Sequence, residues 1–162
     1  MKKLTLLRHA KSSWNYSVSD RDRPLTENGI KAMIKLVRLS KKIFETAQIV
    51  ISSPANRAIH SAIIMMHTAK ISYDKLRVSE SLYTFNGNEV IDFIKENDDS
   101  FNDVIIIGHN PAFTVAANYF SYGKNHQMST SSWIQINFKN KKWNSIEKGI
   151  SVFGSRKINN II

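Results

Sequence analysis

The feature that most constrains the fold of this chain is a run of four branched apolar residues, Val104–Ile107, in the stretch DVIIIGHN. A strand that is apolar at every position is buried on both faces, which is typical of the parallel sheets of α/β proteins. Further β-prone runs occur at Lys3–Leu7 and Gln48–Ser53, and each precedes a longer segment with helical spacing of its apolar residues. This alternation predicts a three-layer αβα sandwich with a mostly parallel sheet, formed as a single domain over residues 1–162.

Helical periodicity and capping residues predict helices after the successive strands. Thr26 is the N-cap candidate of a helix that continues through Phe44. Ser53 is the N-cap candidate of the next helix, with Pro54 at its first position, which proline favours. The further elements expected are a strand near 76–83, a helix at about 89–96 and a helix that begins at 111.

The last third of the chain changes pattern. The segments SSWIQINFKN (131–140) and KKWNSIEKG (141–149) alternate apolar and polar residues around a polar KNKK turn, which predicts a C-terminal antiparallel hairpin. Trp133 and Trp143 are expected to face each other across this hairpin. The final residues, GSRKINNII, are interpreted either as a frayed tail or as a docked extension.

Composition excludes several classes of protein. The chain has no cysteine, so a disulfide framework, a thiolate zinc site and a cysteine nucleophile are excluded. Arg8 interrupts the first apolar run before it reaches the length of a signal peptide, and no segment approaches the roughly 18 apolar residues that span a bilayer. We therefore expect a soluble, cytoplasmic protein without a membrane partner.

The net charge of +10 comes from lysines and arginines that are scattered, with short clusters only in SKKIF and NKKW. We interpret this charge as a solvated surface that attracts anionic substrates, and we expect no nucleic-acid partner. The sequence gives no indication of the oligomeric state.

Three strand ends carry the residues of a candidate catalytic site. Arg8 and His9 follow the first strand, Arg57 lies one turn into the helix after the second, and His109 follows the VIII strand. In open parallel sheets, ligands bind beyond the carboxyl ends of the strands. Two arginines and two histidines at that edge predict a pocket for a dianion such as phosphate.

The chemistry of phosphoryl transfer fits these residue types. A neutral imidazole, here His9, can attack phosphorus, and neighbouring arginines keep it neutral. The two arginines, together with His109 in its protonated form, stabilise the charge of the transferring phosphoryl group. Such stabilisation supplies most of the rate in phosphoryl transfer. The chain shows no obvious carboxylate cluster, so we expect neither a metal nor a cofactor.

The stretch LLRHAKSSW resembles the arginine-histidine signature of the histidine phosphatase superfamily, and specifically its SixA-type phosphohistidine phosphatases. The resemblance continues to about residue 138, through DRDRPLTENG, SSPANRAIHSA, LYTF, IIIGHNPAF and, more weakly, MSTSSWIQINF. It implies that His9 becomes phosphorylated, that Arg8 and Arg57 bind the phosphoryl group, and that His109 stabilises it. Asn15, in a WN pair like that of the sugar-phosphate mutases, is implied as a phosphate contact. Arg23 is expected at most to line the mouth of the phosphate pocket.

The sequence also departs from its relatives. Ala10 replaces the glycine of many superfamily members, although alanine is usual in the SixA-type branch. Mutases and many phosphomonoesterases of the superfamily have an acidic proton donor in the middle of the chain. Here the corresponding LYTF segment offers Thr84, and Glu80 or Glu89 could substitute only through a different geometry.

A missing proton donor bears on the substrate. An alkoxide leaving group needs a general acid, worth roughly 10²–10⁴ in rate, whereas the imidazole of a phosphohistidine departs as a neutral base. We therefore predict hydrolysis of phosphohistidine on a partner protein, either a phosphorelay domain or a phosphocarrier.

Two alternatives remain open from the sequence. One is a phosphatase for small phosphomonoesters or sugar phosphates. The other is a catalytically silent phosphate- or nucleic-acid-binding module, against which the intact set of two arginines and two histidines argues.

Overall fold

The computed structural model describes residues 1–123 and 125–155, and within them six strands form one sheet in the order β3-β2-β4-β1-β5-β6. Strands β1 to β4 pair in parallel, whereas β5 pairs antiparallel with both β1 and β6. The strands are β1 (Lys2–Arg8), β2 (Ile49–Ser52), β3 (Leu76–Val78), β4 (Asp103–Gly108), β5 (Ser132–Phe138) and β6 (Ile150–Ser155).

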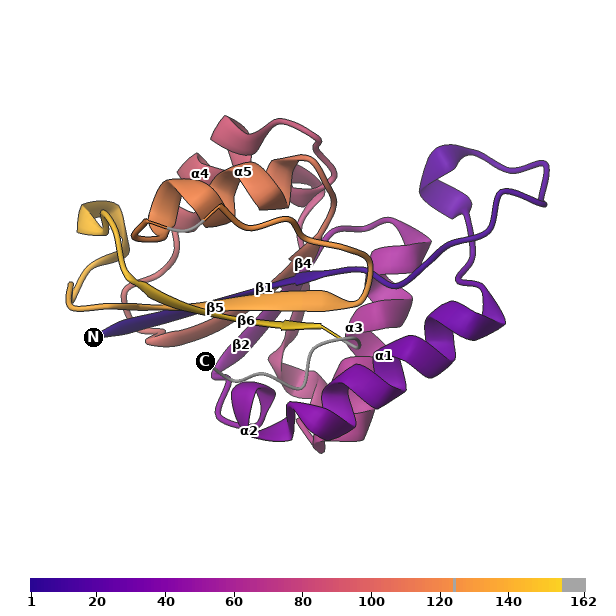
Figure 1. The fold of residues 1–162 in the computed structure, drawn as a ribbon, viewed down its shortest axis with the longest axis horizontal. Coiled ribbons are helices and arrows are strands. Elements are labelled where there is room, and N and C mark those ends of the chain that lie inside the picture. The colour runs from indigo at the N-terminus through magenta and orange to yellow at the C-terminus, as the bar shows by residue number, and fades with distance from the viewer. Residues whose placement is uncertain (124, 156–162) are drawn as a thin grey trace.

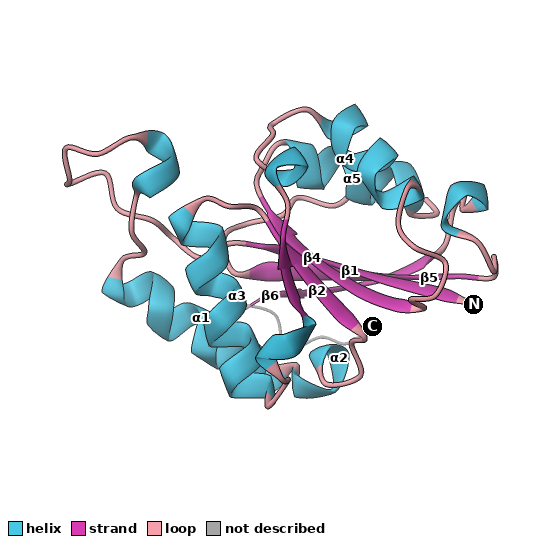
Figure 2. Cartoon of the chain, turned by 180° about the vertical axis from the view of Figure 1, so that it is seen from behind, coloured by secondary structure: helices cyan, strands magenta, loops and turns pink. Residues whose placement is uncertain are grey.

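Helices cover both faces of this sheet. Figures 1 and 2 show α1, α2 and α3 on one face and α4 and α5 on the other, which confirms the predicted three-layer sandwich. Among the described residues, no helix has the length and apolar character required to cross a bilayer. The helices are α1 (Glu27–Leu39), α2 (Lys41–Phe44), α3 (Asn56–Ala69), α4 (Gly87–Lys95) and α5 (Ala112–Phe120).

The central strand β4 explains why the sheet holds two cores. All six of its residues are buried, as the apolar VIII run predicts. Val104 and Ile106 pack in the core beneath α4 and α5, whereas Ile105 and Ile107 pack in the core beneath α1 and α3. Because each such side chain gains about 1.5–3 kcal/mol on burial, this strand fixes the sheet between its two helical layers.

The predicted helix boundaries are right at one end and wrong at two others. Thr26 is the N-cap of α1, and its hydroxyl accepts a hydrogen bond from the backbone N–H of Gly29 at 2.9 Å. The helix does not continue unbroken to residue 44, because it is interrupted at Ser40, whose hydroxyl accepts a hydrogen bond from Trp133 Nε1 at 3.0 Å. The cap predicted at Ser53 is also wrong, since Ala55 holds the N-cap position of α3.

The C-terminal hairpin is antiparallel as predicted, but its second strand is β6 rather than residues 141–149. Trp143 lies in a 3-10 turn and packs in the core beneath α4 and α5, while Trp133 packs on the opposite face of the sheet. The predicted contact between the two tryptophans is therefore wrong. Of the predicted tail, Gly154 and Ser155 belong to β6, and residues 156–162 lie outside the described part of the chain.

Candidate active site

The structure brings Arg8, His9, Arg57 and His109 together at the carboxyl edge of the sheet. Arg8, at the end of β1, pairs in register with Gly108 at the end of β4, so the histidines that follow these strands are neighbours. Their ring centroids are 5.1 Å apart. All four side chains line one pocket of about 410 Å³. The topological argument from the sequence thus predicted which residues meet.

Backbone and hydroxyl hydrogen bonds fix the loop that carries His9. Its N–H donates to the carbonyl of Gly108 at 3.2 Å. The next N–H, that of Ala10, donates to the Ser61 hydroxyl at 2.9 Å, and this hydroxyl donates to the carbonyl of Arg57 at 2.6 Å. One serine on α3 therefore sets the position of His9 relative to Arg57.

The hydrogen bonds of His9 define which ring nitrogen can react. Its Nδ1 lies 2.7 Å from the carbonyl oxygen of Ala10, and because a carbonyl only accepts, Nδ1 carries the hydrogen. The lone pair is then on Nε2. Burial lowers the pKa of His9 to about 3, with further lowering by the charges of His109, Arg57 and Arg8 and opposition from the Ala10 hydrogen bond. The ring is therefore neutral and nucleophilic at pH 7.

His109 faces His9 from the end of β4. Its Nε2 lies 2.7 Å from the Ser53 hydroxyl, and its buried Nδ1 has no partner in the described structure. Burial, and then the charge of Arg57, lowers the pKa of His109 to about 4. Gly108 precedes it because a Cβ there would lie 2.6 Å from the ring of Phe113, which packs against the strand end. Gly108 is thus needed for close packing, and not only for a turn.

The two arginines present donors that nothing in the described residues accepts. Arg8 donates through Nη1 to the carbonyl of Met128 at 2.7 Å, and Arg57 donates through Nη1 to the carbonyl of Asp20 at 2.5 Å. In both guanidinium groups, Nε is buried without a partner in this part of the chain. Since a buried donor without an acceptor costs about 1–3 kcal/mol, these groups favour the entry of an oxyanion.

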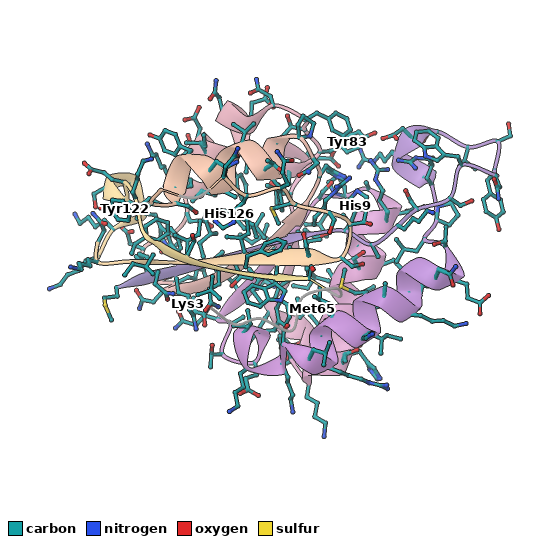
Figure 3. All side chains as sticks on the ribbon, in the orientation of Figure 1. Lys3, His9, Met65, Tyr83, Tyr122 and His126 are labelled. Carbon is teal, nitrogen blue, oxygen red and sulfur yellow. The ribbon has the colours of Figure 1, made fainter. Side chains whose placement is uncertain are left out.

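Asp20 is a pocket residue that the sequence analysis missed. Its carboxylate accepts hydrogen bonds from Arg57 at 3.0 Å, Arg23 at 3.1 Å and the Tyr83 hydroxyl at 2.7 Å. Partial burial alone would raise the pKa of Asp20, but the bonds from Tyr83 and Arg57 lower it to about 2. Asp20 is therefore ionised and neutralises Arg57. Figure 3 shows Tyr83 and His9 on the same side of the molecule.

Comparison with known families supports this reading of the site. A family profile described as the histidine phosphatase superfamily, branch 1, matches residues 4–82, the stretch that contains Arg8, His9 and Arg57. His109 lies beyond the matched residues, and the fold places it against His9. Over this stretch the chain is similar to the histidine phosphatase superfamily. This similarity supports phosphatase activity.

Several solved structures share the fold over nearly the whole chain. The protein histidine phosphatase SixA in complex with tungstate is 18% identical, with a TM-score of 0.76 over 96% of this chain and 97% of that one. A SixA-type protein from Nakamurella multipartitia is also 18% identical, with a TM-score of 0.75 over 94% and 92%. A mycobacterial glucosyl-3-phosphoglycerate phosphatase is 13% identical, with a TM-score of 0.63 over 98% and 100%. A search of curated proteins finds no significant match.

The structure does not bring every predicted site residue to the pocket. Asn15 is exposed and is not among the residues that line it, so its phosphate contact stays a prediction. Glu80 is exposed and pairs with Arg21 at 2.6 Å. Glu89 accepts a hydrogen bond from the Thr84 hydroxyl, and neither glutamate lines the pocket. From the sequence, either glutamate could replace the acidic proton donor of the superfamily only if its geometry differed from that donor's.

Among the described residues, no group of three or more histidines, aspartates or glutamates is placed to hold a metal ion. Arg23 lines the pocket as the sequence suggested.

Proposed function

We propose that this protein hydrolyses phosphohistidine on a partner protein through a covalent phospho-His9 intermediate. The observation that carries the proposal is that the carboxylate in the pocket, Asp20, is paired with Arg57 and Arg23. Among the described residues that line it, Asp20 is the one acid, and with its pKa lowered to about 2 it cannot donate a proton at neutral pH. A substrate whose leaving group needs no proton fits such a site.

In the first step, Nε2 of His9 attacks phosphorus and the bond from phosphorus to the substrate imidazole breaks. If the far nitrogen of the substrate ring is protonated, the leaving group is neutral imidazole. The hydrogen on Nδ1 of His9 stays bonded to the carbonyl of Ala10, so the phosphorylated ring is stabilised as its cation.

Charge in the transferring group is stabilised by groups that are already in position. The free Nε donors of Arg8 and Arg57 and the free Nδ1 of His109 supply hydrogen bonds to phosphoryl oxygens. A dianion in the pocket raises the pKa of His109 by its charge and favours its protonated form. In the second step, water attacks phospho-His9 and neutral His9 leaves.

Phosphatase activity on sugar phosphates is the second candidate, supported by the fold shared with the glucosyl-3-phosphoglycerate phosphatase. This candidate requires a proton donor for an alkoxide, worth roughly 10²–10⁴ in rate. Glu80 and Glu89 are held by Arg21 and Thr84 at the surface, which argues against that role.

The test compares kcat/KM of the wild type for a phosphorelay domain and a phosphocarrier, both phosphorylated on histidine, with its value for sugar phosphates. We expect a preference for phosphohistidine, and changes below about threefold in Glu80→Gln and Glu89→Gln, far less than loss of a general acid causes. Strong hydrolysis of sugar phosphates that collapses in either variant would favour the second candidate.

Turnover of an aryl phosphate by the wild type, if it is abolished in His9→Ala, would exclude a catalytically silent phosphate-binding module. Absence of turnover with every phosphate compound tested would instead favour the silent module.

A further inference from the structure

Two exposed apolar side chains line the pocket, Trp14 and Phe85, at 76 and 50% exposure, and two more, Tyr16 and Val18, at 61 and 48% exposure, follow Trp14 on the same loop. These four side chains are called the apolar rim. We infer that this apolar rim is the docking surface for the folded protein that carries the phosphohistidine, and this inference rests on the proposed function. Apolar side chains gathered at one place on a surface mark sites of interaction, whereas single ones do not.

The rim is continuous with the catalytic pocket. Trp14 and Phe85 line the pocket together with the catalytic groups. The ring centroid of Phe85 lies 5.8 Å from that of His109. Tyr16 and Val18 follow Trp14 on the segment between β1 and α1, which stands out from the body of the molecule in Figure 1. A substrate that delivers its phosphoryl group to His9 therefore arrives beside Trp14 and Phe85, next to the loop that carries Tyr16 and Val18.

The rim is held in place rather than loose. The guanidinium carbon of Arg23 lies 3.6 Å from the ring centroid of Trp14, a cation–π contact. The N–H of Ser13 donates to the carbonyl of Pro24 at 2.8 Å, and Ser12 forms a β-bridge with Leu25. These contacts close the base of the loop, so its apolar side chains are presented to solvent at a smaller entropic cost on binding.

The size of the pocket argues for a protein as the occupant. Tyr16 and Val18 are not among the pocket-lining residues. A molecule small enough to enter about 410 Å³ leaves both side chains in water. A folded protein that presents a phosphohistidine from its surface covers them as well, and gains the free energy of their burial.

Charge defines the partner further. The chain has a net charge of +10, and Lys11, Arg8 and Arg23 line the mouth. The matching surface is a phosphohistidine surrounded by apolar side chains, with acidic residues farther out. Such complementarity raises the association rate, and added salt lowers it.

The experiment uses substitutions outside the pocket, Tyr16→Ser with Val18→Ser. The matched control is Tyr122→Ser with Ile150→Ser, whose side chains are 62 and 68% exposed. Tyr122 lies at the far end of the molecule from His9 in Figure 3. For each protein, kcat/KM is measured with a phosphorelay domain and a phosphocarrier, both phosphorylated on histidine, and with free phosphohistidine.

We expect the Tyr16/Val18 variant to lose about tenfold or more on a phosphoprotein, since two interface anchors contribute at least 1.4 kcal/mol. Its kcat/KM on free phosphohistidine should stay within twofold of wild type, which also shows that it folds. The control should match wild type on every substrate.

Three results would overturn the inference. If the variant retains its activity on the phosphoproteins, or falls no further than the control, the rim is not a docking surface. If wild type hydrolyses free phosphohistidine and neither phosphoprotein, the occupant is not such a protein. If wild type hydrolyses no phosphohistidine at all, the proposed function fails, and this partner fails with it.

Discussion

The two buried histidines should make the folded protein less stable in mild acid. His9 and His109 have pKa values lowered to about 3 and about 4, against about 6.5 in the unfolded chain. Between these values the unfolded chain binds protons that the folded chain does not. Stability is therefore complete above about pH 6.5 and falls as the pH is lowered toward the folded values.

The size of the loss follows from the same pKa values. At pH 5, the protonated form of each histidine outnumbers the neutral form about thirtyfold in the unfolded chain. In the folded chain, each histidine remains largely neutral. Relative to pH 7, this difference lowers the free energy of unfolding by about 2 kcal/mol per histidine, or about 4 kcal/mol for both. A domain of this size has a total free energy of unfolding of only about 5–15 kcal/mol, so the effect is large.

Urea denaturation at pH 7 and at pH 5 measures the change in the free energy of unfolding. His9→Asn and His109→Asn should each remove about half of the pH-dependent loss. If both active-site variants show the same pH dependence as the wild type, the two histidines are not held neutral by the fold.

Three further predictions concern the pocket. His9→Ala should form no phosphoenzyme, whereas His109→Ala should still bind phosphate but react about 10²–10³ times more slowly in single-turnover assays. Activity should survive EDTA, and a loss that magnesium restores would contradict the expectation that the reaction needs no metal. Asp20→Asn should bind tungstate about tenfold more tightly by calorimetry, because the carboxylate that competes for Arg57 is gone. Weaker binding would mean that Asp20 positions Arg57 instead.

The parts of the fold that follow local rules could be predicted from the sequence. Val104–Ile107 is apolar at every position, and only a strand buried on both faces accommodates such a run. The meeting of His9 with His109 follows from the same argument, since both come directly after parallel strands. The periodicity of the sequence is sufficient to predict where a residue lies when a single strand or helix determines its position.

The errors occur where distant contacts decide the structure. Trp143 looked like a strand residue, but its indole Nε1 donates to the carbonyl of Phe101 at 2.8 Å and holds it in a turn. Ser53 looked like a cap, but its hydroxyl lies against His109. Asp20 was given no role from the sequence, because Tyr83, which binds it, lies 63 positions away along the chain. No local pattern encodes these partners.

The missed aspartate changes how the pocket works between turnovers. An empty pocket with Arg8, Arg57 and two histidines at close range gathers positive charge that burial makes costly. The pocket limits this cost in two ways, because the histidines stay neutral and the carboxylate of Asp20 pairs with Arg57. An incoming phosphoryl group must compete with that carboxylate for Arg57, so part of its binding energy is used to displace an internal anion. The same carboxylate re-forms its bonds when phosphate departs, which favours release of a product that would otherwise remain bound to the arginines.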